Sequence, residues 1–256
     1  MDITGKTCVV TGGAQGIGLA LVQALKSRGC RVASVDMVAS DAGVADLTLT
    51  SDVSSREQVG AMLDHVERDL GPVDIMCSNA GIGGAFDETF QNVAFASTEQ
   101  WDRAWGVNVM GHVHAAHFLI PKMKARGGGY FLHTVSAAGL LSQIGSSVYS
   151  TTKHAAIGFA ESLAIGHRDD GIRVSVLCPQ GVATPMLDGI PLGPQAGDGL
   201  LSPDVVAKCA MQGITDERFL ILPHEQVAGY MQAKLDNHDR WIGGMAKLQR
   251  SFKPEN

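Results

Sequence analysis

Short apolar runs alternate with helical patterns along the whole chain. The runs are brief, almost every position in them is apolar, and they are rich in Val, Ile and Leu, which is typical of strands covered by helices on both faces. This alternation predicts an α/β fold of the Rossmann type, a doubly wound parallel sheet flanked by helices in a single domain over residues 1–256. About seven strands are predicted, at Thr7–Thr11, Arg31–Asp36, Leu47–Ser51, Asp74–Ser78, Tyr130–Val135, Arg173–Cys178 and Arg218–Leu222.

Three of the predicted helices carry start signals in the sequence. In each case a serine stands where its side chain can cap the first turn of the helix. The three helices run from a capping box at Ser54–Glu57 to Gly71-Pro72, from Ser97 towards Lys124 with a break near Gly111, and from Ser202 through Pro203 and Asp204.

Two segments depart from the alternation of strands and helices. The loop of about residues 182–201 is rich in glycine and proline, lacks an apolar period and is long for a connection, as are lids and linkers. We interpret it as a substrate loop. The C-terminal extension of about residues 224–256 has apolar residues at roughly helical spacing, which predicts an amphipathic stretch over the edge of the core or over a partner subunit.

The composition narrows the class of protein. With 45% hydrophobic residues, 18% charged residues and a net charge of −6, the chain has a globular composition, and no Lys/Arg cluster offers a surface to nucleic acid or to an anionic membrane. No apolar run approaches the ~18 residues that span a bilayer, and the first residues lack the pattern of a signal peptide. Five cysteines are scattered singly, which indicates reduced thiols. We therefore expect a cytoplasmic protein.

A glycine-rich segment, TGGAQGIG at residues 11–18, follows the first predicted strand and precedes a helix. Gly12, Gly16 and Gly18 stand where a backbone must turn tightly and approach a pyrophosphate at the helix N-terminus. Asp36 ends the second strand, where a carboxylate accepts hydrogen bonds from the adenosine ribose and repels a 2′-phosphate. Because neither segment supplies a basic residue for such a phosphate, NAD rather than NADP is predicted. The alternative is that Asp36 only caps a turn.

The segment YSTTK at residues 149–153 opens another predicted helix. On a helix this spacing stacks Tyr149 and Lys153 on one face, one turn apart. Taken alone, the pair is as consistent with two solvated residues on a helix surface as with two residues that take part in a reaction.

Together these segments resemble the short-chain dehydrogenase/reductase family. The resemblance covers the chain from residue 5 to about residue 222, and its motifs stand in the family's order and at the family's spacing. They are TGGAQGIG, Asp52-Val53, SNAG at 78–81, Asn108 in VNVMG, Ser136 in VSAAG, YSTTK, and CPQGVAT at 178–184.

The resemblance implies hydride transfer between NAD and an alcohol or ketone. Tyr149 would be the general base or acid, Lys153 would lower its pKa and bind the nicotinamide ribose, and Ser136 would hold the substrate oxygen. An ammonium and the positive nicotinamide ring both favour the phenolate. Asn108, beside a helix break, would support a water between Lys153 and solvent. The plainer alternatives are a strand-end turn for Ser136 and a helix bend for Asn108. The implied cofactor-binding residues are Gly12, Gln15, Gly16, Ile17, Gly18, Asp36, Asp52, Val53, Asn79, Ala80, Gly81, Tyr149, Lys153, Pro179, Val182 and Thr184.

Two features depart from the family pattern. Gln180 stands where the family usually has glycine, and its side chain either selects a polar group on the substrate or points outward. The tail also lacks the glycine-rich segment that ends the chain after the last strand in the family. A third feature, the trio His112, His114 and His117, is interpreted as a solvated or interface helix face, because no acid or cysteine completes a metal-ligand set.

The expected substrate pocket is largely apolar and lacks an Arg or Lys that would bind a carboxylate or phosphate. We therefore predict a hydrophobic secondary alcohol or its ketone as the substrate. A reductase that works mainly towards the alcohol and an NAD-sensing module without catalysis are the alternatives. As in the family, a homodimer or homotetramer is expected through helices at about 98–124 and 147–167. The predicted pocket residues are Ser136, Ala138, Leu140, Leu141, Gln143, Gln180, Met186, Leu187, Ile190 and Leu192.

Overall fold

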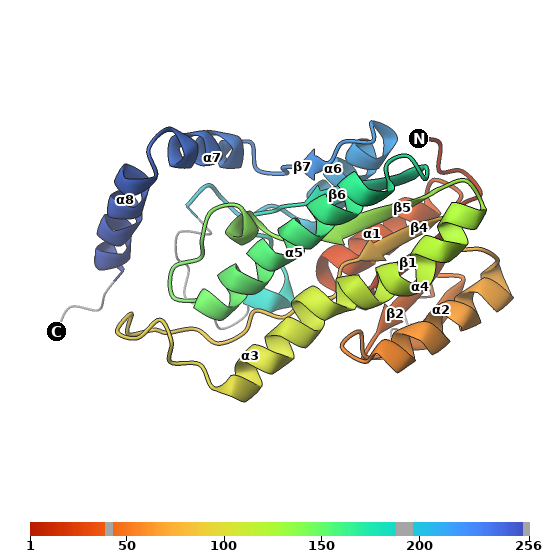
Figure 1. Ribbon diagram of the computed structural model, residues 1–256, viewed down its shortest axis with the longest axis horizontal. Coiled ribbons are helices and arrows are strands. Elements are labelled where there is room, and N and C mark those ends of the chain that lie inside the picture. The colour runs from red at the N-terminus through yellow and green to blue at the C-terminus, as the bar shows by residue number, and fades with distance from the viewer. Residues whose placement is uncertain (39–42, 188–196, 253–256) are drawn as a thin grey trace.

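The computed structural model describes residues 1–38, 43–187 and 197–252. Within these ranges, seven parallel strands form one sheet: β1 (Thr7–Thr11), β2 (Arg31–Asp36), β3 (Leu47–Thr50), β4 (Ile75–Ser78), β5 (Gly129–Thr134), β6 (Ile172–Leu177) and β7 (Leu220–Ile221). Their order in the sheet is β3-β2-β1-β4-β5-β6-β7 (Figure 1). The chain therefore builds outward from β1 to β3 and then crosses back to β4, so the strand order reverses between β1 and β4. The predicted Rossmann-type fold is confirmed, and each predicted strand is present, although β7 is shorter than expected.

Successive strand residues point to opposite faces of the sheet, and helices cover both faces. In β1, Val9 belongs to one hydrophobic cluster, whereas Cys8 and Val10 belong to the other. The helices α1 (Gly16–Lys26) and α6 (Pro203–Thr215) cover the second of these faces. The first face is covered by α2 (Arg56–Leu70), α4 (Gly111–Ala125) and α5 (Ser147–His167).

The helix predicted from Ser97 contains the predicted break. The oxygen of Ser97 accepts a hydrogen bond from the backbone of Gln100, and the Gln100 side chain accepts one in return, so the capping box is complete. This opens α3 (Thr98–Trp105), which passes into the π-helical turn η1 (Gly106–Met110) and then into α4. Such turns are common at functional sites, and this one places Asn108 in the interior.

The capping box predicted at Ser54–Glu57 is not formed at the start of α2. Ser55 is the N-cap and accepts a hydrogen bond from the backbone N–H of Gln58. The Gln58 side chain accepts from the backbone of Asp52 instead of closing a box. A serine therefore caps α2, but it is Ser55 and not Ser54, and the predicted box with Glu57 is wrong.

The expectation that the histidine trio forms a solvated or interface face is wrong for His112 and His114. His112 and His114 are buried, and only His117 is exposed, where it is hydrogen-bonded to Arg56. His112 packs instead against His133 of β5, with their Nδ1 atoms 2.9 Å apart. Over the described ranges, no three His, Cys, Asp or Glu side chains form a metal-binding group.

Two helices follow the last strand and project from one end of the molecule (Figure 1). They are α7 (Gln226–Asp236) and α8 (His238–Ser251), and we call them together the C-terminal arm. Asn237 caps α8 by accepting a hydrogen bond from the backbone of Arg240. Among the described residues of the two helices, only Val227 is buried. The tail is helical, as predicted, but most of it lies outside the core.

Two further expectations concern the chain as a whole. All five cysteines are free, and four of them are buried. In the part of the chain that the structure describes, no helix combines the length and the apolar character needed to cross a bilayer.

Candidate active site

A cavity of about 1120 Å³ opens at the carboxyl ends of the strands, where the strand order reverses. Ligands of open α/β sheets bind at such switch points. The volume exceeds the range of about 300–1,000 Å³ that is usual for one small ligand. The cavity therefore has room for a large ligand.

One end of the cavity is formed by residues 11–18, which we call the glycine cradle. A Cβ on Gly18 would lie 1.8 Å from the carbonyl oxygen of Gly12, and one on Gly12 would lie 2.9 Å from the Cα of Ala80. Gly12 and Gly16 have φ angles of +66° and +55°, which other residues rarely adopt. No side chain of the described residues caps the N-terminus of α1, so its first N–H groups remain available. This bare backbone suits a phosphate group.

Asp36 joins the cradle to the end of β2. Its Oδ2 accepts a hydrogen bond from the backbone of Ala14 at 3.1 Å, and its Oδ1 accepts one from Met37 at 2.7 Å. The carboxylate also lines the cavity. Asp36 therefore caps a turn and faces the cavity at the same time, so the two sequence-based alternatives are compatible.

Asn79 fixes the cradle from the neighbouring strand β4. Its side-chain amide donates hydrogen bonds to the carbonyl oxygens of Thr11 at 3.0 Å and Gly12 at 3.3 Å. Its backbone N–H donates to the hydroxyl of Thr11. The side chain thus holds the turn after β1 in place.

Ser136, Tyr149 and Lys153 meet in the middle of the cavity. Ser136 precedes the short helix η2 (Ala137–Gly139), and its Oγ accepts a hydrogen bond from the backbone of Ala138 at 3.1 Å. The same hydroxyl is hydrogen-bonded to Tyr149. The Nζ of Lys153 lies 5.5 Å from the centroid of the Tyr149 ring and donates to the carbonyl oxygen of Thr134 at 3.4 Å. The spacing of YSTTK therefore gives a paired phenol and amine inside the protein, not on its surface.

Burial dominates the protonation of this pair. It raises the pKa of Tyr149, whereas the hydrogen bond with Ser136 lowers it. Burial also lowers the pKa of Lys153 to about 8. Low-dielectric surroundings disfavour both charges. The expectation that the pKa of Tyr149 lies below its usual value is therefore not met by these residues alone.

Asn108 does not line the cavity but holds Ile82, which does. Its Nδ2 donates hydrogen bonds to the carbonyl oxygen of Ile82 at 2.9 Å and to Thr152 Oγ1 at 3.1 Å. Its Oδ1 accepts one from the backbone of Ile82. Gly81 separates it from Lys153, since a Cβ there would lie 3.2 Å from Nζ. The geometry gives the Asn108 side chain a positioning role, and its support of a water stays a prediction.

The remaining predicted residues divide into three groups. Leu140 packs against the hydrophobic core instead of lining the cavity, and Ile190 and Leu192 lie outside the described residues. The others line the cavity: Gln15, Ile17, Asp52, Val53, Ala80, Gly81, Ala138, Leu141, Gln143, Pro179, Gln180, Val182, Thr184, Met186 and Leu187.

Sequence reasoning missed one basic residue and several aromatic and apolar residues that line the cavity. Arg103 of α3 lines the cavity, although no arginine was expected there. Arg103 lies one turn before Gly106, and a Cβ on Gly106 would contact Ser54. Arg103 is therefore on the side of the cavity near Asp52. The missed residues that line the cavity also include Phe86, Tyr230, Trp241, Met245, Leu248 and Phe252. The helical spacing of Trp241, Met245 and Leu248 was visible in the sequence, but a periodic pattern does not reveal which surface it faces.

The fold and the site define a Rossmann-type α/β protein with a Ser–Tyr–Lys group at the switch point of its sheet. Residues 6–193 match the family described as short chain dehydrogenase, and the chain belongs to this family of oxidoreductases.

Relatives match over nearly the whole chain. A protein of Streptomyces exfoliatus named 1-deoxy-11-beta-hydroxypentalenate dehydrogenase is 32% identical over 93% of this chain and 90% of its own length. An acetoacetyl-CoA reductase of Rhizobium meliloti is 33% identical over 83% of this chain and 92% of its own length. A short-chain dehydrogenase/reductase from Burkholderia phymatum, solved in complex with NAD, superposes with a TM-score of 0.82 at 25% identity and covers 93% of this chain and 96% of its own.

Proposed function

We propose that this protein is an NAD-dependent oxidoreductase that interconverts a hydrophobic secondary alcohol and its ketone. The observation that carries the proposal is that Tyr149, with Ser136 and Lys153 beside it, faces the same cavity as the glycine cradle and Asp36. The Burkholderia neighbour in complex with NAD supports the cofactor, and the name of the Streptomyces relative supports an alcohol dehydrogenase.

The residues at the cradle end fit a dinucleotide. The cradle offers backbone where a Cβ would collide, together with the open N-terminus of α1, and would hold the pyrophosphate. Asp36 would accept hydrogen bonds from the adenosine ribose, and its charge would oppose a 2′-phosphate, so NAD is favoured over NADP. When bound, the nicotinamide supplies the hydride acceptor or donor.

The residues at the centre would move one proton. In the oxidation direction, Ser136 would hold the substrate oxygen, and Tyr149 would take its proton as the carbon-bound hydrogen leaves as hydride to the cofactor. Because burial raises the pKa of Tyr149, the phenolate depends on positive charge beside it. Lys153 would supply part of that charge from its place above the ring, and the oxidised nicotinamide the rest.

The reverse direction is the alternative within this chemistry. The Rhizobium relative is named as a reductase, and the same three residues would return a proton to the ketone oxygen. A homodimer or homotetramer and a cytoplasmic location stay predictions.

Replacement of one tyrosine hydroxyl tests the proposal. Tyr149→Phe should lower turnover of secondary alcohols with NAD⁺ by about 10²–10⁴-fold, the usual contribution of a general base, with little change in NAD affinity. NADH absorbance and calorimetric titration measure the two quantities. Tyr130→Phe is the matched control, because its buried hydroxyl bonds to Ser175 away from the cavity.

Three outcomes separate the alternatives. Equal activity of the two variants would show that Tyr149 does not transfer the proton. Faster turnover of ketones with NADH than of alcohols with NAD⁺ would favour the reductase. NAD binding without turnover of any alcohol or ketone would favour the sensing module.

A further inference from the structure

We propose that the C-terminal arm forms the far wall of the substrate site and selects neutral alcohols that carry a bulky apolar group. The inference rests on the proposed oxidoreductase function and concerns the part of the substrate remote from the reacting hydroxyl. The wall consists of Trp241, Met245, Leu248 and Phe252, which line the same cavity as Tyr149.

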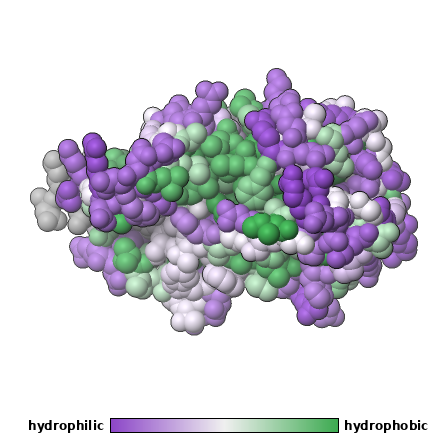
Figure 2. All heavy atoms as spheres, turned by 45° about the horizontal axis from the view of Figure 1, so that its top comes forward, coloured by the Kyte–Doolittle hydropathy of each residue, from purple (hydrophilic) through white to green (hydrophobic). Residues whose placement is uncertain are grey.

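The apolar face of α8 borders the cavity and not the protein core. Trp241, Met245 and Leu248 recur one turn apart and share one face of α8, and Phe252 follows at its C-cap. No described residue of α8 is buried, and Leu248 is 37% exposed. In Figure 2 the outer surface of the arm is mostly hydrophilic, and apolar side chains gather where the arm meets the body. A ligand that covers this face gains binding free energy, because apolar surface is removed from water.

A second apolar side of the same space comes from the segment between β4 and α3. Phe86 lines the cavity and packs so closely on Gly145 that a Cβ there would lie 2.7 Å from its ring. The backbone N–H of Asp87 donates to the carbonyl oxygen of Gly145, and the hydroxyl of Ser146 donates to the carbonyl oxygen of Ala85. The segment is thus fixed to the residues that precede α5, and Figure 1 shows it at the same end of the molecule as α8. The space for the remote part of the substrate therefore has apolar walls on two sides.

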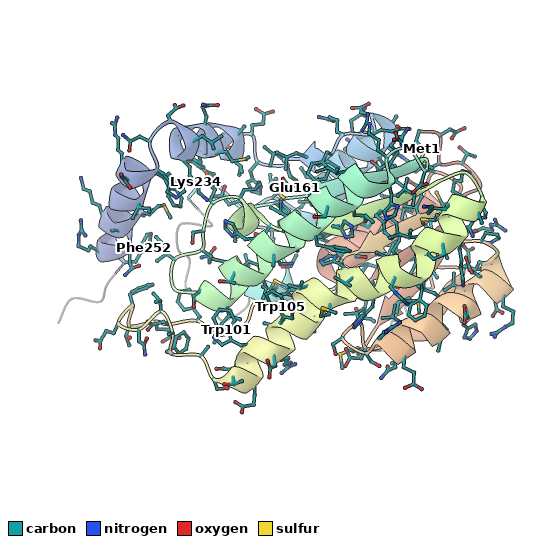
Figure 3. The ribbon with its side chains drawn as sticks, viewed as in Figure 1. Met1, Trp101, Trp105, Glu161, Lys234 and Phe252 are labelled. Atoms are coloured by element: carbon teal, nitrogen blue, oxygen red, sulfur yellow. The ribbon has the colours of Figure 1, made fainter. Side chains whose placement is uncertain are left out.

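Charges at this end disfavour an anionic substrate. Asp198 lines the cavity and accepts a hydrogen bond from the hydroxyl of Tyr230 at 3.0 Å. Lys234 of the arm donates to the carbonyl oxygens of Leu140 at 2.8 Å and Leu141 at 3.1 Å, and lies 4.9 Å from the ring centroid of Trp241. Figure 3 shows this lysine between α7 and the loop after β5. A carboxylate would therefore meet Asp198, while Lys234 is already engaged by the protein.

The arm is anchored to loops that carry reacting residues. Lys234 holds the loop that follows Ser136, and Tyr230 holds the end of the substrate loop at Asp198. Just before α7, Nδ1 of buried His224 accepts a hydrogen bond from the backbone of Gln180 at 3.1 Å. These contacts hold the wall at a fixed place relative to Tyr149, as selection by size requires.

Dependence on substrate size tests the inference. Trp241→Ala is compared with Ile242→Ala, a neighbouring residue of α8 that is 53% exposed and does not line the cavity. The values of kcat and KM are measured with NAD⁺ for isopropanol, cyclohexanol and decalol. Trp241→Ala should lower kcat/KM for decalol by about tenfold or more, mainly through KM, because the apolar contact between the indole and the substrate is lost. The loss should shrink with the size of the alcohol, and Ile242→Ala should behave as the wild type.

Other results would overturn the inference. An equal loss for all three alcohols would make Trp241 a structural residue, and an equal loss in Ile242→Ala would mean that the cavity face of α8 has no special role. Hydrogen exchange of residues 226–251 in the wild-type protein gives a second measure that needs no variant. With NAD⁺ present, decalone should slow exchange in α8 more than acetone does, and the absence of such slowing would contradict a substrate wall. If no alcohol is oxidised although NAD binds, the proposed function fails, while the exchange measurement still decides the role of the arm.

Discussion

The glycine cradle and the C-terminal arm close the same cavity from two ends, but they are built in different ways. The cradle is backbone packed on backbone: Gly18 lies against Gly12, and the Asn79 amide holds the turn between them. The arm offers side chains, is mostly outside the core, and contacts the body through a few anchors such as Lys234. The first construction suits one constant group such as a pyrophosphate, whereas the second suits an apolar ligand whose shape decides the fit.

The two ends should respond oppositely to the same substitution. Gly18→Ala places a Cβ 1.8 Å from Gly12 O, so the cradle must deform, at a cost on the order of 1–3 kcal/mol in unfolding free energy, and NAD binding should be lost. A Cβ on Gly229 of α7 would meet nothing within 4 Å beyond its own helix backbone, and Gly229→Ala should stabilise the helix by about 0.5–1 kcal/mol. Denaturant unfolding and calorimetric titration with NAD measure both effects. NAD binding by Gly18→Ala at wild-type affinity would exclude the cradle as the pyrophosphate site.

Acid should destabilise the sheet more than the arm. His112 and His133 are buried as a pair, with the ammonium of Lys153 near His112, and burial lowers the pKa of both imidazoles, that of His133 to about 3. Unfolded imidazoles titrate near ~6.5, so below that pH the unfolded chain binds protons that the folded chain does not. The contribution of these two imidazoles to stability is therefore complete above ~6.5 and is lost with decreasing pH, by about 1.4 kcal/mol per pH unit for each imidazole.

Urea unfolding between about pH 5 and 8 measures this slope. His133→Gln should reduce it, because one buried imidazole is removed. His238→Gln, at the exposed start of α8, is the control and should leave the slope as in the wild type. An equal slope in all three proteins would mean that other groups govern the acid sensitivity.

The cradle end was predictable from the sequence because its signals are local. A strand, a glycine cluster and a helix follow one another within residues 7–26, and Asp36 ends the next strand. Likewise, the spacing between Tyr149 and Lys153 needs only one helical turn. The errors concern contacts that no local pattern specifies: which of two adjacent serines caps α2, and the burial of His112 against β5.

The arm end was not predictable for the same reason. The period of Trp241, Met245 and Leu248 indicated an apolar helix face, but the choice among core, partner subunit and cavity depends on how α7 and α8 leave the sheet. Phe86 gave no signal, because its segment has no period. Chemistry that lies within one turn or one strand can therefore be predicted from local pattern, whereas the contacts made by a tail cannot.

The smallest effect is expected at an anchor of the arm. Lys234→Met keeps the apolar stem but removes the hydrogen bonds to Leu140 and Leu141, each of which contributes on the order of 1 kcal/mol. The loss should appear as faster hydrogen exchange in α8 and a rise of a few-fold in KM for decalol, with the affinity for NAD unchanged. Lys247→Met, exposed on α8, removes the same charge without an anchor and is the matched control. If both variants behave alike, charge and not anchoring is responsible. If only Lys234→Met responds, the position of the arm sets the fit of the substrate, whereas the cradle is held by its own backbone contacts and would bind NAD equally well in either variant.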